Sequence, residues 1–219
     1  MSYLGAKSGS GTYQAIINLI PPHDTYIEAF LGTGAVMKRK APARHSIGID
    51  LNKKCIDEFD YAAASLIHGN AFDYLRTHDF ESSGRTVVYA DPPYLPETRS
   101  SSAKYDYELT NEDHIELLNI LCKLPCYVLL SGYRSTLYDE HLNNWWSIDF
   151  QSMTRGGVRT ETVWCNFKPG EIHYHTFAGA NYTDRQRIKR KAARWANNFK
   201  SLPIGEKQAV LAAILQSLD

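Results

Sequence analysis

TYIEAFLGTGAVMKRK, residues 25–40, decides the fold of this chain. The segment predicts a strand over TYIEAF, then a turn on Gly32 and Gly34 that enters a helix. HSIGID, residues 45–50, predicts a second strand, and residues 53–66 predict a second helix with Ile56 and Phe59 facing inward. Strand, helix and strand in this order form a βαβ unit, so we expect a parallel sheet.

The alternation of strand and helix continues through residue 131 and then stops. TVVYA (86–90) and CYVLLS (126–131) are continuous apolar runs, typical of strands buried on both faces, and a helix is predicted between them over residues 111–123. WWSIDFQSM (145–153) and VRTETVWCNF (158–167) then flank a Gly-Gly turn. We predict an α/β, Rossmann-like fold whose sheet is mostly parallel and ends in an antiparallel hairpin.

The end of the chain, from about Thr183, has a different pattern. It predicts two helices separated at Leu202 and Pro203. Residues 183–200 contain seven Lys or Arg and one acid, Asp184, and are the only strongly charged segment of the sequence. We therefore predict one α/β domain over residues 1–182 and a helical extension with a basic face over residues 183–219.

Composition limits the class of protein. The 219 residues are 43% hydrophobic and carry no formal net charge, which is typical of a globular domain and gives no indication of a partner or an oligomeric state. No apolar stretch is long enough for a membrane span and the start lacks a signal-peptide layout, so a cytoplasmic location is expected. The four cysteines lack C-x-x-C spacing and His173 and His175 have no third ligand nearby, so no metal site is predicted.

Two features predict a nucleoside site. Gly32 and Gly34 follow a strand and allow close approach of a ligand to the backbone, and Asp50, about twenty residues later, ends the next strand. An acid at that place can accept hydrogen bonds from both hydroxyls of a ribose. Met37 stands where a dinucleotide-binding motif has its third glycine, so a dinucleotide is disfavoured. A tight turn and a helix cap made by Asp50 are the structural alternatives.

Asp91-Pro92-Pro93-Tyr94 follows the central strand, where open α/β sheets bind their ligands. Two prolines make the turn rigid and remove two N–H donors, so the Asp91 carboxylate and the Pro92 carbonyl become acceptors. Such a pair suits a group with two N–H donors, such as the exocyclic amine of a base, and Tyr94 offers a flat ring for stacking that base.

These motifs, in this order and over nearly the whole chain, resemble the Dam-like D12 class of DNA adenine-N6 methyltransferases, and small phage-type members most of all. The resemblance implies S-adenosylmethionine as cofactor and methyl transfer to flipped adenine in DNA, with Asp91, Pro92 and Tyr94 as catalytic residues. It also implies a set of cofactor contacts: Tyr3, Lys7, Glu28, Phe30, Gly32, Gly34, Asp50, Asn70 and Asp91. The family usually has an acid where this chain has Asn70, so either Asn70 or Asp73 would hold the cofactor adenine.

Residues 51–90 leave no room for the target-recognition domain that larger members of the family insert before D-P-P-Y. DNA contacts are therefore expected from the loop after Tyr94, the hairpin tip and the basic helix, and a short or relaxed target sequence is predicted. The candidates are Arg99, Lys104, Tyr105, Arg155, Arg159, Arg187, Lys189, Arg190 and Lys191. Alternatives are methylation of cytosine N4 or of RNA, and a regulator that binds nucleic acid without turnover; the basic helix could also be a solvated face.

Overall fold

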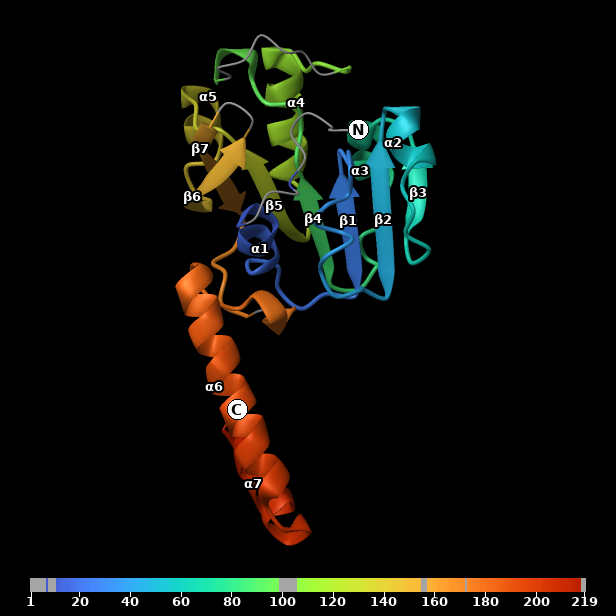
Figure 1. Ribbon diagram of the computed structural model, residues 1–219. Helices are drawn as coiled ribbons and strands as arrows, with labels where there is room; N and C mark the ends of the chain where they lie inside the picture. Colours follow the sequence, from blue (N-terminus) through green and yellow to red (C-terminus); the bar gives the residue numbers. More distant parts are fainter. Residues whose placement is uncertain (1–6, 8–10, 99–105, 155–156, 172, 218–219) are drawn as a thin grey trace. The chain divides into compact units, whose positions relative to one another are not determined.

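The computed structural model describes residues 7, 11–98, 106–154, 157–171 and 173–217. The chain separates into two compact units, one ending at Phe177 and the other beginning at Ala178 (Figure 1).

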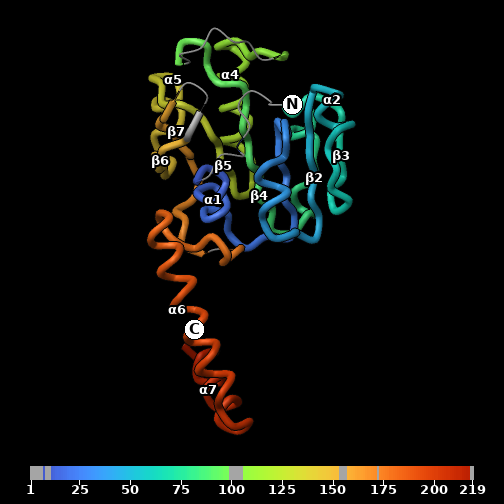
Figure 2. The backbone as a smooth tube through the Cα atoms, in the orientation of Figure 1, coloured from blue at the N-terminus to red at the C-terminus, as the bar shows by residue number. Residues whose placement is uncertain are grey.

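A seven-stranded sheet with the order β3-β2-β1-β4-β5-β7-β6 forms the centre of the first unit (Figures 1 and 2). Strands β3 to β5 in this order are parallel, whereas β7 runs antiparallel to both β5 and β6. The predicted fold class, a mostly parallel sheet ending in an antiparallel hairpin, is confirmed. The strands are β1 (Thr25–Ala29), β2 (His45–Asp50), β3 (Ser65–His68), β4 (Thr86–Ala90), β5 (Tyr127–Gly132), β6 (Trp146–Thr154) and β7 (Gly157–Cys165).

Helices cover both faces of this sheet. They are α1 (Thr12–Ile17), α2 (Lys53–Asp57), α3 (Ala71–Thr77), α4 (Asn111–Leu121) and α5 (Thr136–His141), with short 3-10 turns η1 (Pro96–Thr98) and η2 (His175–Phe177). No helix in the described ranges is long and apolar enough to cross a membrane.

Two predicted helices differ from the structure. Residues 33–39 form a series of turns, in which the N–H of Lys38 bonds the carbonyl of Gly34, rather than a regular helix. The helix predicted over 53–66 ends at Asp57, because Ser65 and Leu66 pair with β2 as part of β3. Phe59, predicted to face inward on that helix, is buried after the helix has ended. Pairing with a neighbouring strand outweighs local helix propensity here.

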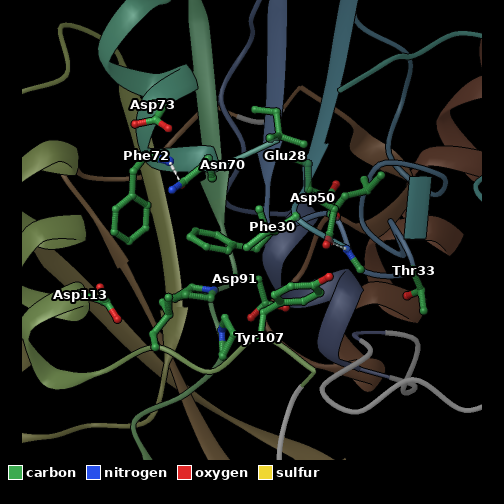
Figure 3. Close-up of a pocket in the computed structure, with 18 of the residues that line it drawn as sticks. Glu28, Phe30, Thr33, Asp50, Asn70, Phe72, Asp73, Asp91, Tyr107 and Asp113 are labelled. Carbon is green, nitrogen blue, oxygen red and sulfur yellow. Dashed lines mark hydrogen bonds between the residues drawn. The ribbon is translucent and has the colours of Figure 1, made fainter. Parts of the chain in front are cut away.

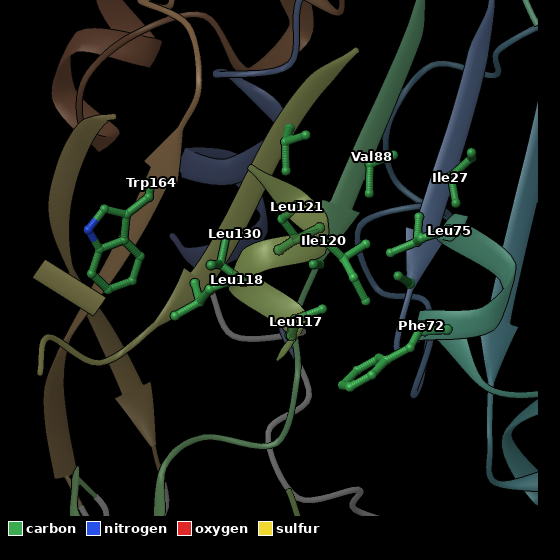
Figure 4. Close-up of a cluster of buried hydrophobic side chains, with 14 of the residues drawn as sticks. Ile27, Phe72, Leu75, Val88, Leu117, Leu118, Ile120, Leu121, Leu130 and Trp164 are labelled. Atoms are coloured by element: carbon green, nitrogen blue, oxygen red, sulfur yellow. The ribbon is translucent and has the colours of Figure 1, made fainter. Parts of the chain in front are cut away.

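Side chains of the central strands alternate between two buried clusters, one on each face of the sheet. The first contains Ile27, Val88 and Leu130 and is covered by α3 and α4 through Phe72, Leu75, Leu117 and Leu121 (Figure 4). The second contains Tyr26, Val87 and Leu129 and is covered by Ile16 and Ile17 of α1 and by Ile20, which follows that helix. Period-two alternation on β1, β4 and β5 therefore buries both faces and fixes the register of the strands.

Helices α6 (Tyr182–Ser201) and α7 (Ile204–Gln216) form the second unit. The Asn181 side chain caps α6 by accepting the N–H of Asp184. Leu202 follows α6 and Pro203 occupies the N-cap position of α7, so the two helices are separated at the predicted residues. Neither helix contains a buried side chain, and Trp195 is 60% exposed. This unit therefore presents its charged and apolar side chains to its surroundings.

Candidate active site

A cavity of about 370 Å³ opens at the carboxyl ends of β1, β2 and β4 (Figure 3). Because parallel strands end at the same edge of a sheet, residues far apart in sequence meet there. Predicted residues in its wall are Lys7, Glu28, Phe30, Gly32, Asp50, Asn70, Asp73, Asp91 and Pro92. Sequence reasoning missed Thr33, Phe72, Arg76, Asp113 and Glu116, which line it as well. Tyr107, which ends the loop expected to contact DNA, also lines it.

Asp50 connects the glycine turn to the start of α2. Its Oδ2 accepts the N–H of Gly32 at 2.7 Å and its Oδ1 accepts the N–H of Asn52 at 2.8 Å. Burial nevertheless raises the pKa of this carboxyl, against the lowering effect of both hydrogen bonds. Each oxygen keeps further lone pairs, so Asp50 can brace the turn and still accept hydrogen bonds from a ligand.

Left-handed backbone conformations shape the turn of residues 30–34, which precedes Asp50 in the chain. Phe30 has a φ of 61°, and Gly32 and Gly34 have φ values of 51° and 57°. A bulky residue in this region is strained, and such strain tends to persist at ligand-binding sites. Phe30 also meets Phe72 edge to face with ring centroids 6.2 Å apart, and both rings line the cavity.

Gly34 does not line the cavity in the described structure. A Cβ placed on it would lie 2.0 Å from Cε2 of Phe59, so this glycine lets the turn pack against the buried Phe59 ring. The prediction that Gly34 contacts a cofactor stays a prediction, and its packing role is an additional reason for a glycine here.

We expect Gly34→Ala to lower the free energy of unfolding by about 2–4 kcal/mol, because it combines a left-handed conformation with a steric clash. Chemical denaturation measures the change. Gly170→Ala is the control, since Gly170 has no heavy atom within 4 Å of its added Cβ and should stay close to wild type. Equal stability of both variants would contradict this account of the turn.

Glu28 is a buried acid at the end of β1. Its Oε2 accepts the hydroxyl of Tyr26 at 3.0 Å and the N–H of Met37 at 2.9 Å. Burial raises its pKa to about 8, so the carboxyl is mostly protonated at neutral pH in the free protein. A cation bound beside it would favour the ionised form and gain a strong charge-assisted contact.

Asn70 and Asp73 lie at the first turn of α3. The Asn70 side-chain oxygen accepts the N–H of Phe72 at 2.8 Å and caps the helix. Its amide group and the Asp73 carboxylate both remain on the cavity wall (Figure 3). Both stay candidates for contact with a ligand.

The D-P-P-Y turn carries a buried network of polar groups. Lys7 donates from Nζ to Oδ1 of Asp91 at 2.7 Å and to the Tyr94 hydroxyl at 2.6 Å. That hydroxyl lies 3.1 Å from Oε2 of Glu161 and 3.3 Å from Oδ1 of Asp91. Burial raises the pKa of Asp91 and the Lys7 charge lowers it. Tyr94 is only 5% exposed and meets Tyr133 edge to face at 4.7 Å, so stacking on a base would require its ring to become accessible.

Sequence reasoning missed Glu161, which comes from β7. A signal was available: on the hairpin strand Glu161 is in phase with Val163 and Cys165, which are buried. An acid at a core-facing position is rarely buried without a partner.

The predicted nucleic-acid contacts that the structure describes belong to both units of the chain. Arg159 lines a second hollow with Tyr133 and Arg134, and it is half-buried. Arg187, Lys189, Arg190 and Lys191 lie exposed on α6, where Arg187 pairs with Asp184. Tyr3, Arg99, Lys104, Tyr105 and Arg155 lie outside the described residues. Among the residues that are described, no cluster of His, Cys, Asp and Glu could hold a metal ion.

Comparison with known proteins gives the following. No protein-family model matches the sequence, and no curated protein is significantly similar to it. Among solved structures, the N-methyltransferase NodS from Bradyrhizobium japonicum WM9 is 9% identical with a TM-score of 0.46, over 68% of this chain and 88% of that one. The O-methyltransferase TomG from Streptomyces achromogenes is 13% identical with a TM-score of 0.46, over 69% and 76%. The fold assignment rests on the strand order and register described above.

Proposed function

We propose that this protein transfers a methyl group from S-adenosylmethionine to the N6 amine of adenine in DNA. The observation that carries the proposal is the placement of the Asp91 carboxylate and the rigid Pro92 on the wall of a cavity shared with Gly32 and Asp50. Acceptors for an exocyclic amine thus lie beside residues suited to a nucleoside. The resemblance to D12-class enzymes supports the same substrate.

The cavity suits this cofactor in size, charge and chemistry. Its volume of about 370 Å³ is in the range of small-molecule sites. Six acids and two bases line it, and the acids outnumber the bases even with Glu28 protonated, which favours a ligand that carries positive charge, such as a sulfonium with an ammonium group, over one that carries phosphates. Asp50 would accept the ribose hydroxyls, Glu28 would face the ammonium group, and Phe30 and Asn70 or Asp73 would contact the adenine.

The catalytic work falls to the D-P-P-Y turn. When bound, S-adenosylmethionine supplies an electrophilic methyl group. The Asp91 carboxylate and the Pro92 carbonyl accept the two N–H groups of the target amine, which localises the nitrogen lone pair that the purine ring otherwise delocalises. The ionised Asp91 also stabilises the positive charge that develops on the nitrogen, and it can take the proton that the methylated amine loses.

The helical extension supports a nucleic-acid partner. We propose that residues 1–182 bind the cofactor and the target base, and that residues 183–219 contact the phosphate backbone through Lys189, Arg190 and Lys191. Arg159 and Tyr133 are candidates for contacts closer to the flipped base. Since residues 51–90 are occupied by α2, β3, α3 and β4 and leave no room for an inserted recognition domain, we expect a short or relaxed target sequence.

Transfer of tritiated methyl groups to duplex DNA, single-stranded DNA and RNA, followed by nucleoside analysis, tests the proposal. We expect label in N6-methyladenine of DNA. Label only in N4-methylcytosine or only in RNA would replace the proposed substrate. Binding of S-adenosylmethionine without transfer to any of the three would favour a regulator.

A further inference from the structure

Glu161 reaches the catalytic turn from the antiparallel end of the sheet. It lies on β7, opposite Phe150 of β6, and is 4% exposed. Its Oε2 is 3.1 Å from the Tyr94 hydroxyl and 3.6 Å from Nζ of Lys7. A buried carboxylate is costly unless it is paired, and both of these partners also contact Asp91.

The described side-chain contacts of the Asp91 carboxylate are made to one of its two oxygens. Within the described part of the chain, the two side-chain donors within hydrogen-bond distance of its carboxylate, Nζ of Lys7 at 2.7 Å and the Tyr94 hydroxyl at 3.3 Å, both lie at Oδ1. The Asp91 side chain keeps 16% exposure and lines the cavity. A carboxylate held through one oxygen has a fixed orientation, and its other oxygen, Oδ2, stays available as an acceptor.

We infer that Glu161 is a positioning residue that orients the Asp91 carboxylate through Tyr94 and Lys7, so that Oδ2 faces the target amine. The inference rests on the proposed function. Glu161 itself does not touch the target base in this account. It completes a four-residue network in which two carboxylates share one ammonium group and one hydroxyl.

The Tyr94 hydroxyl explains why an acid is needed at this position. It has one proton to donate and two carboxylates within reach, and Glu161 is the nearer of them at 3.1 Å against 3.3 Å. Without Glu161 the hydroxyl would donate its proton to Asp91. The Lys7 charge, which Glu161 and Asp91 now share, would then act on Asp91. Both changes would draw charge toward Oδ1 and weaken Oδ2 as an acceptor for the amine.

Steady-state methyl transfer by Glu161→Gln and Glu161→Met tests the inference, because the first keeps an acceptor oxygen and the second removes it. We expect kcat to fall by about 10²-fold in Glu161→Met and by less in Glu161→Gln. The dissociation constant of S-adenosylmethionine, measured by calorimetry, should stay within about twofold of wild type. Glu140→Gln, which removes an exposed acid of α5, is the control and should behave as wild type.

A double-mutant cycle with Tyr94→Phe separates positioning from a general loss of structure. If Glu161 acts through the Tyr94 hydroxyl, the double variant Tyr94→Phe/Glu161→Gln should be little worse than the poorer single variant. Multiplied effects, or a Glu161→Met enzyme with wild-type kcat, would overturn the inference while leaving methyl transfer by the wild type in place. A wild type that methylates no nucleic acid would overturn the proposed function and this inference together.

Discussion

Replacing Asp91 by Ala is expected to reduce methyl transfer by about 10³-fold at saturating DNA and cofactor. The variant lacks the carboxylate that accepts an amine N–H and stabilises positive charge on the nitrogen, while the Pro92 carbonyl remains. Cofactor binding should survive, because Gly32, Asp50 and the aromatic walls are unchanged. Single-turnover transfer of tritiated methyl groups measures the rate, and calorimetry measures cofactor affinity.

Removing Asp91 also leaves the buried Lys7 with one carboxylate partner fewer, so the free energy of unfolding of the variant has to be measured beside its activity. Asp91→Asn keeps the shape of the side chain and should lose transfer to a similar extent. Asp60→Ala, a change at an exposed acid after α2, is the control. Transfer within tenfold of wild type by a well-folded Asp91→Ala enzyme would refute the proposed mechanism.

The sequence predicts the sheet well because the signal is local and repeated. The apolar runs at 86–90 and 126–131 are typical of buried strands, and the two long strand-like segments that flank a Gly-Gly turn after residue 145 predicted the hairpin. The incorrectly predicted segments are those whose structure depends on contacts with residues distant in the sequence. Residues 33–39 and 58–66 carry helical spacing, but β3 pairs with β2 and the glycine turn packs on Phe59.

The residues of the candidate site likewise fall into two groups, those that local sequence places in the site and those that only long-range contacts place there. Gly32, Asp50, Asn70 and Asp91 could be grouped from sequence because each follows a strand or opens a helix at one edge of a parallel sheet. Glu161 differs, because its phase with Val163 and Cys165 indicates a core-facing acid but its place beside Asp91 depends on the register of the antiparallel hairpin. The surroundings of Tyr94 were equally hidden, because its burial depends on Lys7, Tyr133 and Glu161 together.

Lys7→Met should shift the pH dependence of methyl transfer to higher pH. Asp91 has to be ionised to accept the amine, burial and the Glu161 charge raise the pKa of Asp91, and the Lys7 charge and hydrogen bond lower it. Without Lys7 the lowering effect is lost, so the pKa of Asp91 rises further and the carboxyl stays protonated to higher pH. The loss of kcat should therefore be largest at low pH, about tenfold or more at neutral pH, and should diminish as pH rises.

Measurement of kcat from about pH 5.5 to 9.5 checks this expectation, with Lys123→Met as the control for loss of an exposed lysine. Among the described residues, the cation that faces Asp91 is Lys7, and the other titratable groups around it are Glu28, Glu161, Tyr26, Tyr89, Tyr94, Tyr133 and Tyr138. Glu161→Gln removes a negative charge that raises the pKa of Asp91. The rise of kcat on the acidic side of the same profile should therefore move to lower pH. A loss of equal size at every pH would show that Lys7 does not set the charge of Asp91; a raised dissociation constant for S-adenosylmethionine would then assign it to the cofactor instead.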